Sequence, residues 1–300
     1  MSFETFFIAD AKFWLLAVVA LSAALLQPVA AEEPHRHRRP AVSPILHHLP
    51  IPTRPRQYEL VVARFDEELG WLKQVPTFWM VTVLNKGKPD VAALRENVEV
   101  IHCPQTNENG REGELIAAYI YQRWNSLAEY TAFCQGFPME HNPQYIELLD
   151  QPALLSAVQP MSYIYKPGVT SAEAINLNKK QPLYRSEVIS LRTLDSVYFR
   201  DDFIWVVAQQ IAKNFSVPLG TNLMSYYLGS VGLPGWISED QETGHFAYGG
   251  MIGVHKAKIL QHHMEVYARI STSVNDFRWT GVLLERAWLM LFGGSDYRDP

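Results

Sequence analysis

Hydrophobic runs that stop abruptly at polar or glycine-containing turns are the clearest pattern in the chain, and they predict buried strands. Four such runs lie at residues 58–64 (YELVVAR), 78–84 (FWMVTVL), 98–103 and 130–135 (YTAFCQ). Apolar runs of this length without polar alternation are typical of strands that are covered on both faces. The second run ends at the turn Asn85-Lys86-Gly87, and the fourth ends before Gly136.

Apolar positions with a helical period separate these runs. Asn109 and Glu112 form a capping-box pattern, and hydrophobic residues then recur three and four positions apart, so we expect a helix that begins at Gly110. Further helices are predicted at residues 144–155, 203–215, 256–270 and 280–292, with a short one near Trp71. Residues 244–254 (GHFAYGGMIGV) predict one more strand, whose glycines let another segment come close.

The order strand, helix, strand, strand, helix, strand predicts an α/β fold with a mostly parallel, Rossmann-like sheet flanked by helices. The chain has 300 residues, of which 48% are hydrophobic. That is ample for one sizeable core, and we expect a single α/β domain over residues 57–300. The irregular stretch at residues 161–193 is more typical of a binding loop or lid than of filler.

The N-terminal segment carries a targeting pattern. Residues 13–26 are apolar and uncharged, and Val29-Ala30-Ala31 follows as a cleavage site, which predicts a signal peptide at residues 1–31. The run is shorter than the roughly 20 residues of a bilayer span. The segment before this run carries Glu4 and Asp10 against Lys12, so it is not the positively charged start of a typical signal peptide. A longer count from Phe6 leaves an uncleaved membrane anchor through residues 13–31 as the alternative.

Either alternative predicts entry into the secretory pathway, in the Golgi or ER lumen or secreted. Residues 32–56 are rich in Pro, His and Arg without a sustained period, and we expect a linker there. Asn214-Phe215-Ser216 is a glycosylation sequon, which has meaning only in that pathway.

Charge and missing motifs argue against several classes of function. The net charge of −5 gives no reason to expect a nucleic-acid partner, since phosphate-backbone binding needs a basic surface. No GxGxxG, Walker, HExxH, GxSxG or CxxC pattern is present, which argues against a dinucleotide enzyme, an NTPase or a zinc protease. Two cysteines, Cys103 and Cys134, are too few for a disulfide framework, and either one bridge or two free thiols remain open. Asp201 is expected to cap a helix, and His255, His262 and His263 to be surface or core residues.

Two places carry candidate chemistry. The helix start Asn109-Gly110-Arg111 offers backbone N–H groups and a cation that suit a phosphate or carboxylate, although neighbouring glutamates could satisfy the helix dipole instead. Ligands in open α/β sheets sit at the carboxyl ends of strands, which makes Gln135, Glu140 and His141 candidates.

Glu285 stands out in the apolar helix at residues 280–292, whose only other charge is Arg286. A carboxyl group in such a helix must be paired with a cation, protonated or catalytic. Pairing with an arginine, for which Arg64, Arg111 and Arg278 are the expected partners, and catalysis both stay open.

The motifs in this order resemble a family. They are VVARFDEELGWL (61–72), LNKG (84–87), NGRE (109–112), YTAFCQGFPMEH (130–141) and ERAWLMLFG (285–293). On these motifs the chain is similar, over residues 58–293, to an uncharacterised eukaryotic family best known in fungi and described only as a domain of unknown function. That family is itself similar in layout to the glycosyltransferase-A fold, in which a first strand ends in an acidic loop, a second in a small turn, and a basic helix start precedes the next strand.

This resemblance implies roles for particular residues. Asp66 and Glu67, with Arg64 before them, would border the nucleotide of a nucleotide sugar. Arg111 would lie at the diphosphate and Glu285 would act as base. Where those transferases carry an Asp-x-Asp pair, this chain has residues 135–141 (QGFPMEH), so a divalent Mn or Mg ion would have Glu140 and His141 as its ligands.

We therefore expect a glycosyltransferase-like protein that moves a sugar from a nucleotide-activated donor to a small-molecule or glycan acceptor. Two alternatives remain. One is a non-catalytic carbohydrate-binding module of the same fold. The other is a hydrolase that uses Glu285 with Asp66 or Glu140 as paired carboxylates.

Overall fold

The structure is a computed structural model that describes residues 56–88, 97–103, 111–162, 186–197, 201–274 and 279–293. The chain divides into two compact units, Met1–Arg39 and Pro40–Pro300, and all described residues belong to the second. The expected signal peptide or anchor and nearly all of the expected linker lie outside the described residues. Within the described ranges no helix is both long and apolar enough to cross a membrane.

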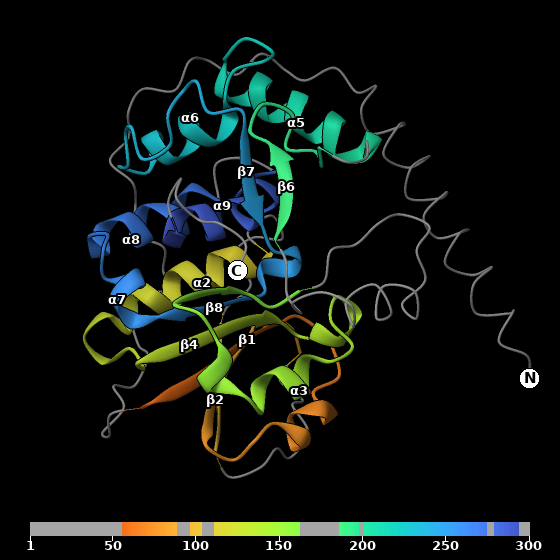
Figure 1. The fold of residues 1–300 in the computed structure, drawn as a ribbon, viewed down its shortest axis with the longest axis vertical. Helices are drawn as coiled ribbons and strands as arrows, with labels where there is room; N and C mark the ends of the chain where they lie inside the picture. The colour runs from red at the N-terminus through yellow and green to blue at the C-terminus, as the bar shows by residue number, and fades with distance from the viewer. Residues whose placement is uncertain are drawn as a thin grey trace, which may run out of the picture. The chain divides into compact units, whose positions relative to one another are not determined.

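The main sheet has six strands in the order β3-β2-β1-β4-β8-β5 (Figure 1). Their bounds are β1 Tyr58–Arg64, β2 Trp79–Asn85, β3 Val98–His102, β4 Tyr130–Gln135, β5 Val158–Pro160 and β8 Ile252–His255. β1 is parallel to both of its neighbours and β2 is parallel to β3, whereas β8 runs antiparallel to β4 and β5. The prediction of an α/β fold with a mostly parallel sheet is confirmed, while the antiparallel strand was not foreseen.

The strand order reverses beside β1. From β1 the chain proceeds to β2 and β3 on one side, and then returns to place β4 on the other side of β1. The register aligns Ala63 with Gln135, so the segments that follow these two parallel strands leave the sheet at the same edge. Such a reversal point is where open α/β sheets bind ligands.

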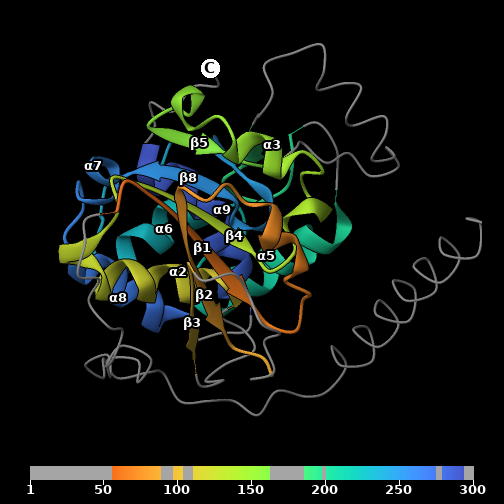
Figure 2. The same ribbon diagram turned by 90° about the horizontal axis from the view of Figure 1, so that it is seen from below.

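Helices cover both faces of the sheet (Figure 2). One face packs on α2 (Arg111–Gln122) and α9 (Thr280–Gly293), and α8 (Met264–Ser273) packs against α2. Phe133, Ile116 and Trp288 share the hydrophobic core of this face. The opposite face packs on the short helices η2 (Gly70–Gln74) and α3 (Tyr145–Leu149), which complete a second core.

A second, two-stranded antiparallel sheet is formed by β6 (Glu187–Ser190) and β7 (Thr243–Phe246). β7 contacts α9. Figure 1 shows the strand pair between α9 and the helices α5 (Asp202–Phe215) and α6 (Leu223–Ser230). The side chain of Asp201 accepts hydrogen bonds from the first backbone N–H groups of α5, which confirms its predicted role as a cap.

Three element predictions are wrong in extent. Residues 244–254 form two strands in different sheets, because Gly249 and Gly250 take positive φ of 62° and 59° within the turn η7 (Tyr248–Gly250). Residues 256–270 form two helices, α7 (Lys256–Ile259) and α8, separated where buried His262 binds the carbonyl oxygen of Leu291. Of residues 144–155 only α3 is α-helical, since Pro152 cannot donate a helical hydrogen bond and starts the 3-10 turn η6 (Pro152–Leu154).

Both cysteines are free and buried, so the disulfide alternative is wrong. Burial raises the pKa of Cys103 to about 11 and that of Cys134 to about 12. Thiols with such pKa values stay protonated at neutral pH and pack as small hydrophobic groups.

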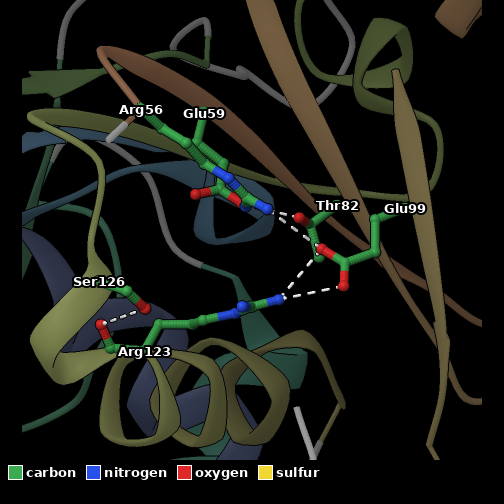
Figure 3. Close-up of polar contacts among 6 residues, drawn as sticks. All are labelled: Arg56, Glu59, Thr82, Glu99, Arg123 and Ser126. Carbon is green, nitrogen blue, oxygen red and sulfur yellow. Dashed lines mark hydrogen bonds and ion pairs between the residues drawn. The ribbon is translucent and has the colours of Figure 1, made fainter. Parts of the chain in front are cut away.

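A buried ionic network joins α2 to the amino-terminal half of the sheet (Figure 3). Glu99 of β3 accepts hydrogen bonds from Arg123, which follows α2, at 3.0 and 3.2 Å, and from Arg56 at 3.3 Å. Arg56 also pairs with the fully buried Glu59, whose carboxylate accepts a hydrogen bond from Thr82 at 2.7 Å. This network fixes α2 at its carboxyl end and leaves its amino end, with Arg111, at the opposite edge of the sheet.

Candidate functional site

The carboxyl ends of β1 and β4 bring the first predicted residues together. Glu67, in the loop after β1, lies directly against Gly136, which follows β4, and a Cβ at Gly136 would overlap the Glu67 carboxylate. That carboxylate accepts a hydrogen bond from the backbone N–H of Phe65 at 2.7 Å. The acidic loop is therefore folded back toward Gln135 rather than extended into solvent.

Arg64 holds this loop in place. Its guanidinium donates to the carbonyl oxygen of Glu67 at 2.9 Å, to the side chain of Asn85 at 2.8 Å and to the carbonyl oxygen of Lys88 at 3.1 Å. Arg64 is buried, and these contacts tie the end of β1 to the end of β2. A direct contact between Arg64 and a nucleotide stays a prediction.

The turn after β2 fits against the same loop. A Cβ at Gly87 would overlap the carbonyl oxygen of Phe65, and the backbone N–H of Lys88 approaches the Asp66 carboxylate at 3.4 Å. The two motifs that carry the family resemblance here, the acidic loop and the Asn-Lys-Gly turn, are thus packed on each other.

The turn η7 packs against the residues that follow β4. Gly249 lies against the Gln135 side-chain oxygen and the His141 ring, which a Cβ at that position would meet at 2.9 and 3.1 Å. The His141 ring stacks on Tyr248, with centroids 6.0 Å apart and an interplanar angle of 23°. Both rings are half-buried. The glycines required here are the ones that break the predicted strand at residues 244–254.

Glu285 reaches the same turn from α9. Its Oε1 accepts the backbone N–H of Gly249 at 2.7 Å, and its Oε2 lies 3.4 Å from Nη1 of Arg286. The residue is 9% exposed, so the two contacts orient a nearly buried carboxylate. The structure brings Glu285 together with Gln135 and His141, which the sequence placed far away along the chain.

Among the described residues, the arginine that pairs with Glu285 is not one of those expected. Arg286 is the partner, whereas Arg64 is used in the loop after β1 and Arg278 lies outside the described residues. Arg286 also donates to the carbonyl oxygen of Leu194 at 3.0 Å and lies 4.8 Å from the centroid of the Phe246 ring. Sequence reasoning overlooked it because neighbouring helix residues point in different directions, and only the length of the arginine side chain lets it reach back.

Glu112 is the functional candidate that the sequence did not identify, because its capping-box pattern explained it as a helix-start residue. Gly113 lies against Leu284, and this close contact between α2 and α9 brings half-buried Glu112 near Glu285. Burial raises the pKa of Glu112, and the negative charge of Glu285 raises it further, while Arg111 lowers it. Glu67 raises it as well, so three carboxylates share this site.

The remaining predicted residues stand at its periphery. Arg111 is exposed as the first residue of α2, with φ of 45°, and Asn109 and Gly110 lie outside the described residues. Asp66 and Glu140 are exposed. The carboxyl group whose pKa the charge of Glu285 raises is that of Glu112, a residue that the hydrolase alternative did not include.

The donor set for a divalent cation is incomplete in the part of the chain that the structure describes. No group of three or more His, Cys, Asp and Glu side chains there could hold a metal ion. Glu140 faces solvent, and His141 stacks on Tyr248. These two residues alone do not fit a metal centre, and binding of Mn or Mg by them stays a prediction.

Comparison of the chain with protein-family models, with curated proteins and with solved structures finds no match. The family resemblance inferred from the motifs therefore stays a prediction, and the function has to be argued from the site.

Proposed function

We propose that the protein is a glycosyltransferase-like enzyme of the secretory pathway that moves a sugar from a nucleotide-activated donor to a hydroxyl group of an acceptor. The observation that carries the proposal is the convergence of Glu67, Gln135 and nearly buried Glu285 at the strand-order reversal beside β1. Polar and carboxylate side chains gathered at the point where the strand order of an open α/β sheet reverses are typical of a ligand site.

The order of elements adds support. β1 ends in the acidic loop at residues 66–68, β2 ends in the small turn with Gly87, and α2 begins with Arg111 before β4. This is the layout that the resemblance to the glycosyltransferase-A fold implies, and it rests on fold analogy.

In the proposed reaction, the Glu285 carboxylate takes the proton of the acceptor hydroxyl as general base. The oxygen then forms a bond to the anomeric carbon of the donor, and the bond from that carbon to the diphosphate oxygen breaks. The diphosphate leaves with the electron pair, and Arg111 at the start of α2 stabilises its charge. The bond from the Gly249 N–H keeps the Glu285 carboxylate aimed into the site. No step is assigned to a metal ion, because Glu140 and His141 do not form a complete ligand set.

A screen of thermal stability against nucleotide sugars tests this function. A ligand at one hundred times its Kd adds about 2.7 kcal/mol to the free energy of unfolding, which is readily seen as a rise in melting temperature. Each nucleotide sugar is tested with and without manganese, and beside the free nucleotide and the free sugar. A chain that no nucleotide sugar stabilises is not a transferase of this kind.

One observation favours a second candidate, a carbohydrate-binding module without turnover. Phe65 and Phe137, which follow β1 and β4, are 48% and 44% exposed. Exposed aromatic rings beside polar groups suit stacking on a sugar face. Binding of free sugars without any effect of nucleotide sugars in the same screen would identify this module.

A further inference from the structure

The buried indole N–H of Trp288 points to a ligand that the proposed function leaves undefined. Trp288 is 1% exposed, and among the described residues its Nε1 has no hydrogen-bond partner. A buried donor without an acceptor is destabilising, so such a group in a native structure calls for an explanation, and a bound ligand is one.

The position of this N–H is set by α9. Trp288 follows Glu285 by three residues, so both side chains lie on the same side of the helix. The indole Cδ1, which is bonded to Nε1, lies 3.8 Å from the point where a Cβ of Gly250 would stand. The Glu112 side chain lies 3.4 Å from that same point through its Cγ. Glu112 and the N–H edge of Trp288 therefore both lie against Gly250, with Ile116 beside them, while Glu285 binds the neighbouring Gly249, so the three side chains border the turn η7.

The hydrogen-bonding groups of Glu112, Glu285 and Trp288 favour one class of ligand. Two carboxyl groups accept hydrogen bonds and one indole N–H donates, and a hydroxyl group can do both at once. An anionic ligand would meet the charges of Glu285 and Glu67, which already raise the pKa of Glu112. The half-buried rings of His141 and Tyr248, which stack on each other beside Gly249, add the aromatic surface common in sugar sites.

We propose that Glu112, Glu285 and the indole N–H of Trp288 form the acceptor subsite, which takes neighbouring hydroxyl groups of a neutral sugar. The inference rests on the proposed function in that it names the acceptor class. Its geometry nevertheless predicts sugar binding without any donor. One hydroxyl donates to Glu285 and is the group that gives up its proton, while its neighbour bridges Glu112 and Trp288.

The test is a titration of the full chain followed by the NMR signals of its indole N–H groups. The chain has 8 tryptophans, and the signal of Trp288 is the one missing in Trp288→Phe. Methyl glycosides of glucose, galactose and mannose are the probes, and methyl glucuronide is the anionic comparison. We expect the Trp288 signal to move with at least one neutral glycoside and to stay unchanged with the glucuronide.

Trp236 is the internal control, because its N–H already donates to the carbonyl oxygen of Met290 at 2.9 Å and should not respond. Trp288→Phe removes the indole N–H while it keeps an aromatic ring at this position, and should raise the Kd of the responding glycoside about three- to tenfold, the scale of one hydrogen bond. Glu112→Leu, a change at a half-buried position, should weaken binding similarly while the chain stays folded.

The inference is overturned if no neutral glycoside moves the Trp288 signal up to its solubility, or if the glucuronide moves it equally. Failure of the transferase proposal has a different signature. Glycosides would then move the Trp288 signal, while nucleotide sugars would leave the melting temperature unchanged.

Discussion

Two contacts stabilise the nearly buried carboxylate of Glu285 in the apolar helix α9. The backbone N–H of Gly249 donates to it from the turn η7, where Gly249 has a left-handed backbone conformation. The guanidinium of Arg286, the next residue of α9, pairs with its other oxygen. The role of Glu285 depends on its negative charge and on its hydrogen-bond partners, and a substitution that removes only the charge separates these two contributions.

Glu285→Gln keeps the shape of the side chain and an oxygen for the Gly249 N–H but cannot accept a proton. We expect turnover, or donor hydrolysis when no acceptor is supplied, to fall by about 10²- to 10⁴-fold, with a small change in melting temperature. Arg286 still has the Leu194 carbonyl oxygen and the Phe246 ring as partners, which limits the loss of stability. A folded variant with full activity would show that Glu285 is structural.

Glu112 should make the stability depend on pH. Its pKa is raised in the folded protein above the ordinary value of 4.5, so the folded state binds more protons than the unfolded state as pH rises through that range. The free energy of unfolding is thereby reduced with rising pH, from the ordinary pKa up to the raised one. Relative to wild type, Glu112→Gln should gain stability with rising pH in this window.

Urea unfolding of both proteins at several pH values measures this difference. Glu147→Gln, at an exposed position of α3, serves as the control and should follow wild type. A difference between Glu112→Gln and wild type that stays constant from acid to neutral pH would contradict the raised pKa.

At the scale of elements, the site depends on loops that pack directly on one another. The turn after β2 and the acidic loop after β1 are in contact at Gly87, where no side chain fits. The position of Glu67 is therefore set jointly by two strands and their turns, and a change in one turn should move the carboxylate that the other presents.

Gly87→Ala places a methyl group on the Phe65 carbonyl oxygen and forces the two loops apart. We expect a loss of about 1–3 kcal/mol in the free energy of unfolding, as for overpacking of a close contact, and weaker ligand binding at the site. Gly70→Ala is the matched control, because a Cβ there meets nothing within 4 Å. Urea unfolding should show it within about 0.5 kcal/mol of wild type, and equal losses for both variants would refute the contact.

At the scale of the whole molecule, the targeting prediction can be joined to a surface position. Asn214, the acceptor of the sequon, is exposed in the last turn of α5. If the chain enters the secretory pathway, Asn214 should carry a glycan. The chain from eukaryotic cells should then lose mass on treatment with an N-glycosidase, and Asn214→Gln should not.

Deletion of residues 1–31 is the control for this experiment and should abolish the glycan together with export. N-terminal sequencing of the exported chain separates cleavage after Ala31 from anchoring. A fully exported chain without the modification would leave the targeting prediction intact and refute the use of this sequon.

Local pattern by itself determined much of this protein. β1, β4, α5 and α9 lie within one or two residues of their predicted bounds, because an apolar run or a helical period defines them without reference to distant segments. The same holds for the placement of Gln135 at a strand end and for the isolation of Glu285 in an apolar helix.

Only the tertiary structure decided the rest. Whether residues 244–254 form one strand or two depends on β4 and β6, which accept β8 and β7 in separate sheets. The meeting of Glu112 with Glu285 depends on how closely α2 approaches α9 at Gly113. These contacts join residues far apart in the chain, and no local period encodes them.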